Sequence, residues 1–444
     1  MANPHPRAVV IEAARRVEIE IAPNPAFIDQ DVSIRVCGAA PEARVTLRAE
    51  ARDDARRIWC SRGVYVADAL GRVDIAGQES VDGTYRGRDA MGLFWSMKLE
   101  PSELGGRATF RKDGVEADSV TLTAEIDDWV IATCKLERQW LAPGTEIRDA
   151  NEEGLVGRFF IPPGRGPRPA VIVLGGSGGG YDLDKAAVLA RHGFATLALA
   201  YFGMPGLPSW LHRVPLEYFA HAIAWLKRQP EVDARRMGVL GISRGAELAL
   251  LLSSAFPEIR AVVAYAPSAV AWGSGGRDKI TGEAIPCWTR RGEAVPFSPL
   301  PLRGFIVRSA LPVALLRRPV KFRNLFRAAL RNHNAVERAQ IPVEQTRGPV
   351  LMISGGDDRV WPAARMAEMI CERLHVRKFP HSVEHSHYPK AGHELRYPFI
   401  PTTPRTTRPG GMKFPIFFGG SATADAEAQK DAWRRTITFF GNSL

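Results

Sequence analysis

The sequence predicts a two-domain chain in which an all-β sandwich precedes a larger α/β domain with a mostly parallel sheet. Residues 15–140 alternate short β-prone runs with turn residues, a pattern typical of a sandwich. From residue 141 onward, apolar runs alternate with helical patterns, and strands that alternate with helices form a parallel sheet covered on both faces. A chain of 444 residues, 45% of them hydrophobic, is long enough for two domains, which we place at 15–140 and 141–444.

The first domain is expected to be a series of short strands separated by turns. The β-prone runs are RVEIEIAP, DVSIRVCG, RVTLRAEA, GVYVADALG, GTYRGRDAMGLFWSMKLEP and SVTLTAEI. Trp59 and Trp95 also lie in this half of the chain, and we expect both to fill the core of the sandwich.

The second domain contains five apolar runs that we predict to be strands of one sheet. They are AVIVLGG (170–176), FATLALAY (194–201), MGVLGIS (237–243), AVVAYAP (261–267) and VLMISGG (350–356). Helical patterns lie between most of them; PLEYFAHAIAWLKRQ, for example, has apolar residues at helical spacing behind a proline at its start.

Ser243 stands between two glycines in the stretch GVLGISRGAEL, residues 238–248. An apolar strand precedes it and a helix-forming run follows, and strand, sharp turn and helix together are what a nucleophile elbow requires. Gly241 and Gly245 permit close packing around a strained serine, and the helix N-terminus favours a developing negative charge. This context favours a catalytic nucleophile over the alternative, a small residue in a tight turn.

A serine hydroxyl needs a base to take its proton, and the base needs an orienting acid. In an open α/β hydrolase these residues follow in the order serine, acid, histidine. Asp357 and Asp358 directly follow an apolar run, and His393 follows the next β-like run. We assign His393 as the base and Asp358 as the acid, because Asp358 and Pro362 match a D-x-x-x-P turn. Asp357 remains the alternative acid, and the aspartate not used is expected to cap the helix that begins near Pro362.

The oxyanion formed during such a reaction needs two backbone donors. We expect one to be the N–H of Arg244 and the other to come from the loop GGSGGGYD (175–182), at Ser177 or Gly178. Glycines in that loop let the backbone approach a substrate without a side-chain clash. A phosphate cradle is the weaker interpretation, because the loop lacks the Gly-Lys-Ser/Thr ending of a P-loop and the spacing of a dinucleotide fingerprint.

The net charge of +11 is concentrated in one segment. Residues 277–347 hold fourteen Lys and Arg against five Asp and Glu, a local excess of +9. Because the excess is local, we expect no nucleic-acid partner. A basic surface beside a catalytic serine indicates a substrate that carries phosphates. The alternative is that this segment is simply a solvated, arginine-rich face. The stretch 268–347 also interrupts the strand and helix alternation, and we predict that it caps the active site. The substrate-binding candidates in it are Arg290, Arg291, Arg317 and Arg318.

The composition also limits which cellular compartment and which cofactors we expect for this protein. Five widely spaced cysteines without a C-x-x-C pair disfavour a disulfide framework and a zinc site, and we expect a cytoplasmic protein. The cluster His381, His385 and His387 has no acidic or cysteine partner at helical spacing, so we expect no metal and no cofactor. No stretch approaches the roughly 18 apolar residues of a membrane span, and the first residues lack the apolar core of a signal peptide.

With these motifs the sequence resembles the acyl-CoA thioesterase and bile acid-CoA:amino acid N-acyltransferase family. The resemblance covers about residues 15–270 and 348–400, whereas 268–347 is longer and more basic than the family pattern. The motifs that carry it, in the family's order, are VTLRAEA, RRIWCSRGVYVADALGRVD, GTYRGRDAMGLFWSMKLEP, LERQWLAPG, LGGSGGGYD, GFATLALAYFG, LEYFAHAIAWL, LGISRGAEL and YPKAGHELRYPFIP.

The resemblance implies an immunoglobulin-like first domain, an α/β-hydrolase second domain and a triad of Ser243, Asp358 and His393. Family members that transfer acyl groups to amino acids tend to have cysteine at the elbow, so Ser243 favours water as the acceptor. We therefore expect an acyl-CoA thioesterase that works through an acyl-enzyme. The alternatives are an acyl-CoA:amino acid N-acyltransferase, a dienelactone-hydrolase-like carboxylesterase, and a binding protein whose hydrolase half is vestigial. An intact triad in the right chain order weighs against the last of these.

Overall fold

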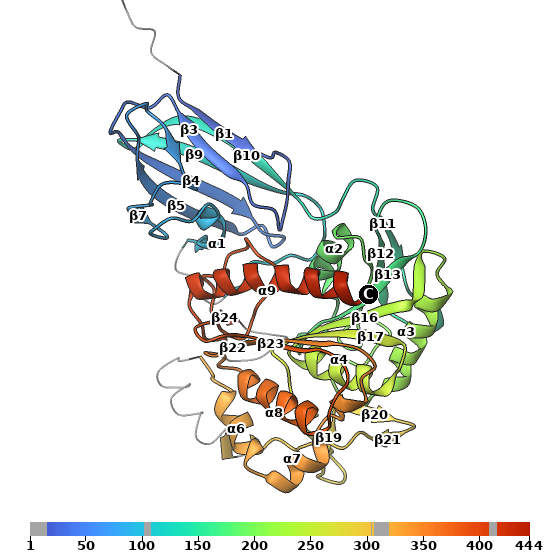
Figure 1. The fold of residues 1–444 in the computed structure, drawn as a ribbon. Helices are drawn as coiled ribbons and strands as arrows, with labels where there is room; N and C mark the ends of the chain where they lie inside the picture. The colour runs from blue at the N-terminus through green and yellow to red at the C-terminus, as the bar shows by residue number, and fades with distance from the viewer. Residues whose placement is uncertain (1–15, 102–107, 303, 306–318, 408–414) are drawn as a thin grey trace, which may run out of the picture.

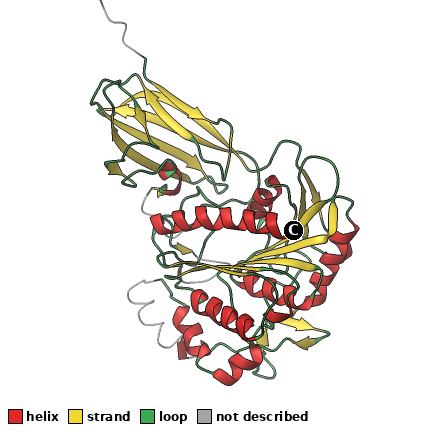
Figure 2. Cartoon of the chain, in the orientation of Figure 1, coloured by secondary structure: helices red, strands yellow, loops and turns green. Residues whose placement is uncertain are grey.

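The fold was obtained as a computed structural model, which describes residues 16–101, 108–302, 304–305, 319–407 and 415–444. The chain forms a β-rich part, blue to cyan in Figure 1, and a larger part in which strands and helices alternate. Figure 2 shows that helices lie almost entirely in the second part. These are the two fold types that the sequence predicts.

The first part consists of two sheets whose side chains alternate between core and solvent. One sheet has the order β1 (Glu18–Ala22), β3 (Ser33–Cys37), β6 (Val73–Asp74). The other has the order β2 (Ala26–Phe27), β10 (Trp129–Gln139), β9 (Asp118–Ile126), β4 (Arg44–Arg52), β5 (Ile58–Val66), β7 (Asp82–Gly83), with β8 (Lys98–Glu100) beside β5. Trp59 on β5 and Trp95 at the end of α1 (Gly92–Trp95) are both buried, as the sequence predicted.

The second part is built on one eight-stranded sheet. The first two strands pair antiparallel, and all strands from β14 onward are parallel. In spatial order the strands are β11 (Glu146–Asp149), β12 (Gly157–Ile161), β14 (Ala195–Leu199), β13 (Arg168–Leu174), β16 (Val232–Ile242), β17 (Ile259–Tyr265), β22 (Val350–Gly355) and β23 (Val383–Tyr388).

Helices cover both faces of this sheet, so alternate residues of one strand enter two different cores. On β13, Ala170 and Ile172 pack on one side, whereas Val171 and Val173 pack on the other. A strand buried on both faces must be apolar throughout, which is why these strands appear in the sequence as continuous apolar runs. One face carries α3 (Leu216–Arg228), α4 (Arg244–Ala255) and α8 (Ala363–Val376), and the other carries α2 (Leu183–Arg191) and α9 (Ala422–Ser443).

The insertion between β17 and β22 forms short strands and helices at the end of the molecule away from the sandwich (Figure 1). Its described elements are β18 (Gly273–Arg277), β19 (Ala284–Pro286), β20 (Trp288–Arg290), β21 (Glu293–Ala294), α6 (Arg323–Leu330), α7 (His333–Ala339) and the 3₁₀ turn η3 (Val343–Gln345). The remaining short elements are η2 (Glu152–Gly154), β15 (Val214–Pro215), β24 (Thr406–Thr407) and β25 (Ile416–Phe417).

Asp29 joins the two parts. Its buried carboxylate accepts hydrogen bonds from Arg191 Nη1 (2.6 Å) and Trp433 Nε1 (3.1 Å) and pairs with His192 Nε2 (2.6 Å). Burial opposes ionisation of Asp29, but the hydrogen bond to His192 and the charges of His192 and Arg191 outweigh it and lower its pKa. Because Arg191 and His192 end α2 and Trp433 lies on α9, one side chain of the sandwich holds two helices of the second part.

We expect Asp29→Ala to lower the free energy of unfolding by about 3 kcal/mol, because removing one partner of a buried ion pair leaves the other charge uncompensated. Asp31→Ala is the matched control, since Asp31 pairs with Lys430 at the surface (59% and 57% exposed). That change should cost less than about 1 kcal/mol. Urea unfolding of both variants measures the difference, and equal losses would contradict the assignment of Asp29 as the anchor.

Candidate active site

Ser243 occupies a strained turn between β16 and α4. Its backbone has φ 57° and ψ −118°, a region that a serine adopts only when its surroundings impose it. A Cβ on Gly241 would lie 2.0 Å from the carbonyl oxygen of Gly245, and one on Gly245 would lie 2.4 Å from the carbonyl oxygens of Leu174 and Gly175. Neither position accepts a side chain, so both glycines of the motif are required by close backbone contacts.

Ser243, His393 and Asp358 form one hydrogen-bonded chain. His393 Nε2 lies 3.0 Å from Ser243 Oγ, and His393 Nδ1 lies 2.7 Å from Asp358 Oδ2. The other oxygen of Asp358 accepts the backbone N–H groups of Val360 (2.8 Å) and Trp361 (3.0 Å). Ser243 is 9% exposed, His393 7% and Asp358 1%. The three side chains that the sequence singled out therefore meet in a nearly buried position, with the carboxylate fixed by two backbone donors.

Asp357 points to a different part of the structure. Its carboxylate accepts the backbone N–H of Gly420 (3.0 Å) and pairs with Arg359 (2.5 Å). The predicted helix cap is wrong, because α8 begins after Pro362 without a side-chain hydrogen bond at its N-terminus. Asp357 instead fastens the segment that leads into α9.

The last part of the chain holds the loop that carries His393. The backbone N–H of His393 donates to the carbonyl of Phe418 (3.0 Å), and the Phe418 ring stacks on the imidazole at 6.1 Å. The preceding N–H, that of Gly392, donates to Asp425 Oδ1 (2.7 Å). Burial raises the pKa of Asp425 to about 7, despite the Gly392 hydrogen bond and the charge of Arg405. The sequence pattern did not point to Phe418 or Asp425, since neither belongs to a local motif.

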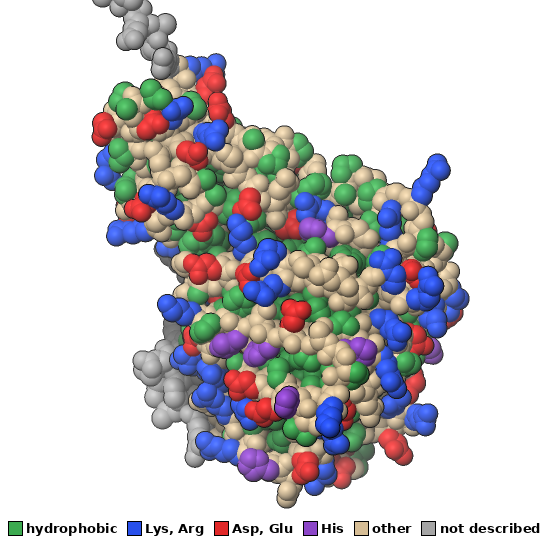
Figure 3. All heavy atoms as spheres, viewed as in Figure 1, with side chains coloured by type: hydrophobic (Ala, Val, Ile, Leu, Met, Phe, Trp, Pro, Cys, Tyr) green, Lys and Arg blue, Asp and Glu red, His purple; other side chains and the backbone are tan. Residues whose placement is uncertain are grey.

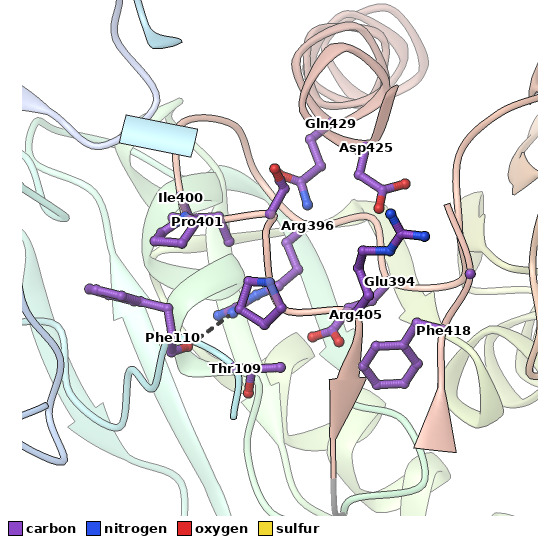
Figure 4. A pocket seen from close by; sticks show the side chains of 13 residues that line it. Thr109, Phe110, Glu394, Arg396, Ile400, Pro401, Arg405, Phe418, Asp425 and Gln429 are labelled. Atoms are coloured by element: carbon purple, nitrogen blue, oxygen red, sulfur yellow. Dashed lines mark hydrogen bonds between the residues drawn. The ribbon is translucent and has the colours of Figure 1, made fainter. Parts of the chain in front are cut away.

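Figure 4 shows Asp425 reaching from α9 toward Arg405, with Phe418 nearby and with Thr109 and Phe110 of the sandwich on the opposite side. The cavity between these side chains measures about 30 Å³. This is room for a water molecule or two rather than for a substrate.

The loop that follows β13 passes beside Ser243. Gly176 lies nearest, since a Cβ there would be 3.4 Å from the Ser243 Cβ and 3.9 Å from its Oγ. In the described part of the chain, the N–H groups of Ser177 and Gly178 have no hydrogen-bond acceptor. Arg244 is the first residue of α4, so no carbonyl of its own helix accepts its N–H. Backbone donors without an acceptor therefore lie next to Ser243 in the chain and in the loop beside it, and Gly176 joins the candidates named from the sequence.

A buried ion pair on α4 ties the elbow to the insertion. Arg244 Nη1 donates to Glu247 (2.8 Å), and Arg244 Nη2 donates to the carbonyl of Gly273 (2.8 Å). The other oxygen of Glu247 accepts Trp288 Nε1 (2.7 Å) and the backbone N–H of Trp272 (3.2 Å). Burial raises the pKa of Glu247 despite the charge of Arg244. Arg244 and Glu247 together thus fix the described start of the insertion against the helix, a role that the motif alone did not reveal.

Arg290 and Arg291 lie at the other end of α4 from Ser243. Both line a cavity with Ser254 and Ala255, which belong to the last turn of that helix. Ser254 lies eleven residues after Ser243 in the chain, a distance of about 16.5 Å at 1.5 Å per residue. The pairing of β20 with β15 and β21 holds the two arginines there. The structure does not bring them to Ser243, and their contact with a phosphate-bearing substrate stays a prediction.

The other predicted basic residues, Arg317 and Arg318, lie outside the described residues. On the face seen in Figure 3, Lys and Arg side chains are spread over both parts of the molecule and interspersed with Asp and Glu. The local excess along the sequence does not appear on this face as a single basic stripe.

The histidine cluster belongs to the edge of the sheet. His385 Nε2 and His387 Nδ1 both lie within hydrogen-bonding distance of Ser354 Oγ (2.8 and 3.2 Å), across the pairing of β22 with β23. In the described ranges, no three His, Cys, Asp or Glu side chains are placed to hold a metal ion together. None of the described helices has the length and apolarity to cross a membrane. The five cysteines are unpaired.

Comparison with known proteins adds a family to this geometry. Two family models match the chain. The model for the "Acyl-CoA thioester hydrolase/BAAT N-terminal region" matches residues 29–152, and the model for the "BAAT / Acyl-CoA thioester hydrolase C terminal" region matches residues 214–444. The peroxisomal succinyl-coenzyme A thioesterase of Mus musculus is 31% identical over 431 residues, which cover 94% of each chain. Acyl-coenzyme A thioesterase 1 of Homo sapiens is 31% identical with the same coverage, and the human mitochondrial acyl-coenzyme A thioesterase 2 is 31% identical over 94% of this chain and 82% of its own. The chain belongs to the acyl-CoA thioester hydrolase and bile acid-CoA:amino acid N-acyltransferase family.

Proposed function

We propose that this protein is an acyl-CoA thioesterase in which Ser243 is the nucleophile, His393 the general base and Asp358 the orienting acid. The observation that carries the proposal is the hydrogen-bonded chain from Ser243 Oγ through His393 to Asp358, presented on a strained turn at the start of α4. A serine becomes nucleophilic only when such a base takes its proton, and the arrangement has no evident structural purpose that would justify the strain.

In the first step, Ser243 Oγ attacks the thioester carbonyl while His393 Nε2 accepts the hydroxyl proton and Asp358 stabilises the imidazolium. The N–H of Arg244 and one N–H from residues 176–178 donate to the oxyanion. When the tetrahedral intermediate collapses, the carbon–sulfur bond breaks, His393 returns the proton to the coenzyme A sulfur, and the acyl group remains as an ester on Ser243.

In the second step, His393 takes a proton from a water molecule, whose oxygen attacks the acyl ester. The bond to Ser243 Oγ breaks, His393 returns the proton to that oxygen, and the free acid leaves. Serine rather than cysteine at the elbow supports water as the acceptor over the amine of an amino acid, the alternative reaction of the family. An esterase acting on uncharged substrates would use the same steps with an alcohol as the leaving group.

The relatives named above include one peroxisomal and one mitochondrial protein, so a cytoplasmic location remains a prediction for this chain.

An acyl-CoA panel tests the proposal directly. The purified protein is incubated with acyl-CoA esters of different chain lengths, with and without glycine or taurine, and free acid, amide and free thiol are resolved. We expect free acid and free thiol in equal amounts and no amide. Ser243→Ala should lower turnover at least about a thousandfold, because removing one member disables the whole catalytic unit. Activity retained within tenfold in this variant, or amide as the main product, would contradict the proposal.

The two adjacent aspartates provide a matched pair. Asp358→Asn should lower kcat by about 10³- to 10⁴-fold, because the amide favours the wrong tautomer of His393. Asp357→Asn changes the neighbouring residue in the same way, but within the described residues the Asp357 carboxylate bonds to Gly420 and Arg359 and not to His393, so kcat should stay within about threefold and any loss should appear as stability. The opposite ranking in steady-state kinetics would exchange the two roles.

A further inference from the structure

A cavity of about 610 Å³ lies beside the last two turns of α4. It is formed by the end of α4, the start of α3, the hairpin of β20 and β21, and the segment from α7 to η3. Its volume falls in the range typical of small-molecule sites, about 300–1,000 Å³. None of the residues that line it takes part in the proposed bond-breaking steps, but Arg290 and Arg291 are also the residues for which the sequence predicts contact with a phosphate-bearing substrate.

The floor of this cavity is apolar. Leu216 and Leu251 line it from α3 and α4, and Ala271 and Ala339 line it from the insertion. These four side chains are between 1% and 5% exposed, so they form a fixed surface of the core rather than mobile surface groups. Val295, Pro296 and Pro342 extend the apolar lining toward the rim.

The rim carries three guanidinium groups, those of Arg290, Arg291 and Arg338, against one carboxylate, that of Glu293. Within the described residues, none of the three arginines has a carboxylate oxygen closer than 4 Å, and Glu293 is likewise without a cationic partner at that distance. The charged lining groups therefore leave a net charge of +2, which the neighbouring carboxylate of Glu217 reduces to +1. Arginine presents a planar fork of donors that matches the paired oxygens of a carboxylate or a phosphate.

Arg291 is held at the mouth of the cavity by its turn. Arg291 (φ 53°) and Gly292 (φ 81°) join β20 to β21. The backbone N–H of Arg291 donates to Glu217 Oε1 at 2.8 Å. Glycine or asparagine is favoured over arginine in such a left-handed position. The contact with Glu217, at the start of α3, fixes the turn in this conformation and keeps the guanidinium beside the cavity.

From this combination we propose that the cavity is a second ligand site, which binds an amphipathic anion with its chain on the apolar floor and its oxyanion head among the three arginines. A fatty carboxylate and an alkyl phosphate share this chemistry. The residues of α4 that line the site, Leu251, Ser254 and Ala255, lie about 12 to 18 Å along the helix from Ser243, so a ligand bound there does not occupy the turn at Ser243.

Isothermal titration of Ser243→Ala protein with dodecanoate, below its micelle concentration, tests the site without depending on turnover. We expect dodecanoate to bind with one equivalent per protein and Arg338→Glu to raise its Kd at least tenfold, because the substitution removes a charge-assisted hydrogen bond and puts a second negative charge beside the head group. Ser254→Trp, which fills the cavity from α4, should abolish that equivalent. Arg331→Glu makes the same charge change at an exposed position outside the cavity and should leave it unchanged.

Four further ligands identify the chemistry. Dodecyl phosphate should compete with dodecanoate for the site. The ligand with the lower Kd shows whether the site prefers a phosphate or a carboxylate head group. Dodecanol, which lacks the charge, and acetate, which lacks the chain, should each bind at least tenfold more weakly. The proposal is overturned if Arg338→Glu and Arg331→Glu have equal effects, if dodecanol binds as tightly as dodecanoate, or if coenzyme A alone binds with the same dependence on Arg338. Since Arg338 is exposed, its variant remains informative even where Ser254→Trp fails to fold.

Discussion

The close approach of α4 to the end of β13 is the contact on which the candidate site depends. Gly245 lies against the carbonyl oxygens of Leu174 and Gly175, so the helix that starts after Ser243 touches the strand that leads into the loop of residues 175–182. The strained backbone of Ser243 lies two residues before this contact, and the loop that follows β13 places Gly176 beside the serine side chain. A methyl group on Gly245 has no room between the two backbones. It would push α4 away from β13 and would disturb both the turn at Ser243 and the position of Gly176.

The remaining groups come from the carboxyl ends of neighbouring parallel strands, where open α/β sheets gather their functional residues. Asp358 follows β22 and His393 follows β23, while the segment around Phe418 and the start of α9 fix the histidine loop from behind. On the other flank, the Arg244–Glu247 pair fastens the insertion to the same helix that carries the serine. The site is thus assembled on α4 and two strand ends, and each of its groups has its own support.

The fold types and the three residues of the hydrogen-bonded chain were accessible from the sequence, because Ser243 and Asp358 follow apolar strands and His393 follows the next β-like run. The spacing of Asp358 to Pro362 also favoured Asp358 over Asp357 as the residue that pairs with His393. Asp425, Phe418 and Glu247 were missed or given no role, since their contacts are made by segments far apart in the chain. The charge excess in 277–347 did not show on which side Arg290 and Arg291 would lie, because charge counted along a chain does not specify a face.

The central claim is that acyl donors react through one common acyl-enzyme on Ser243, and product partitioning tests it most directly. An octanoyl thioester of coenzyme A and the 4-nitrophenyl ester of the same acid are each turned over at a fixed concentration of hydroxylamine, and the ratio of hydroxamate to free acid is measured. After subtraction of the Ser243→Ala background, a common intermediate predicts the same ratio from both donors, because the leaving group has departed before partitioning. A ratio that differs with the leaving group, or product formation that survives in Ser243→Ala, would contradict the account.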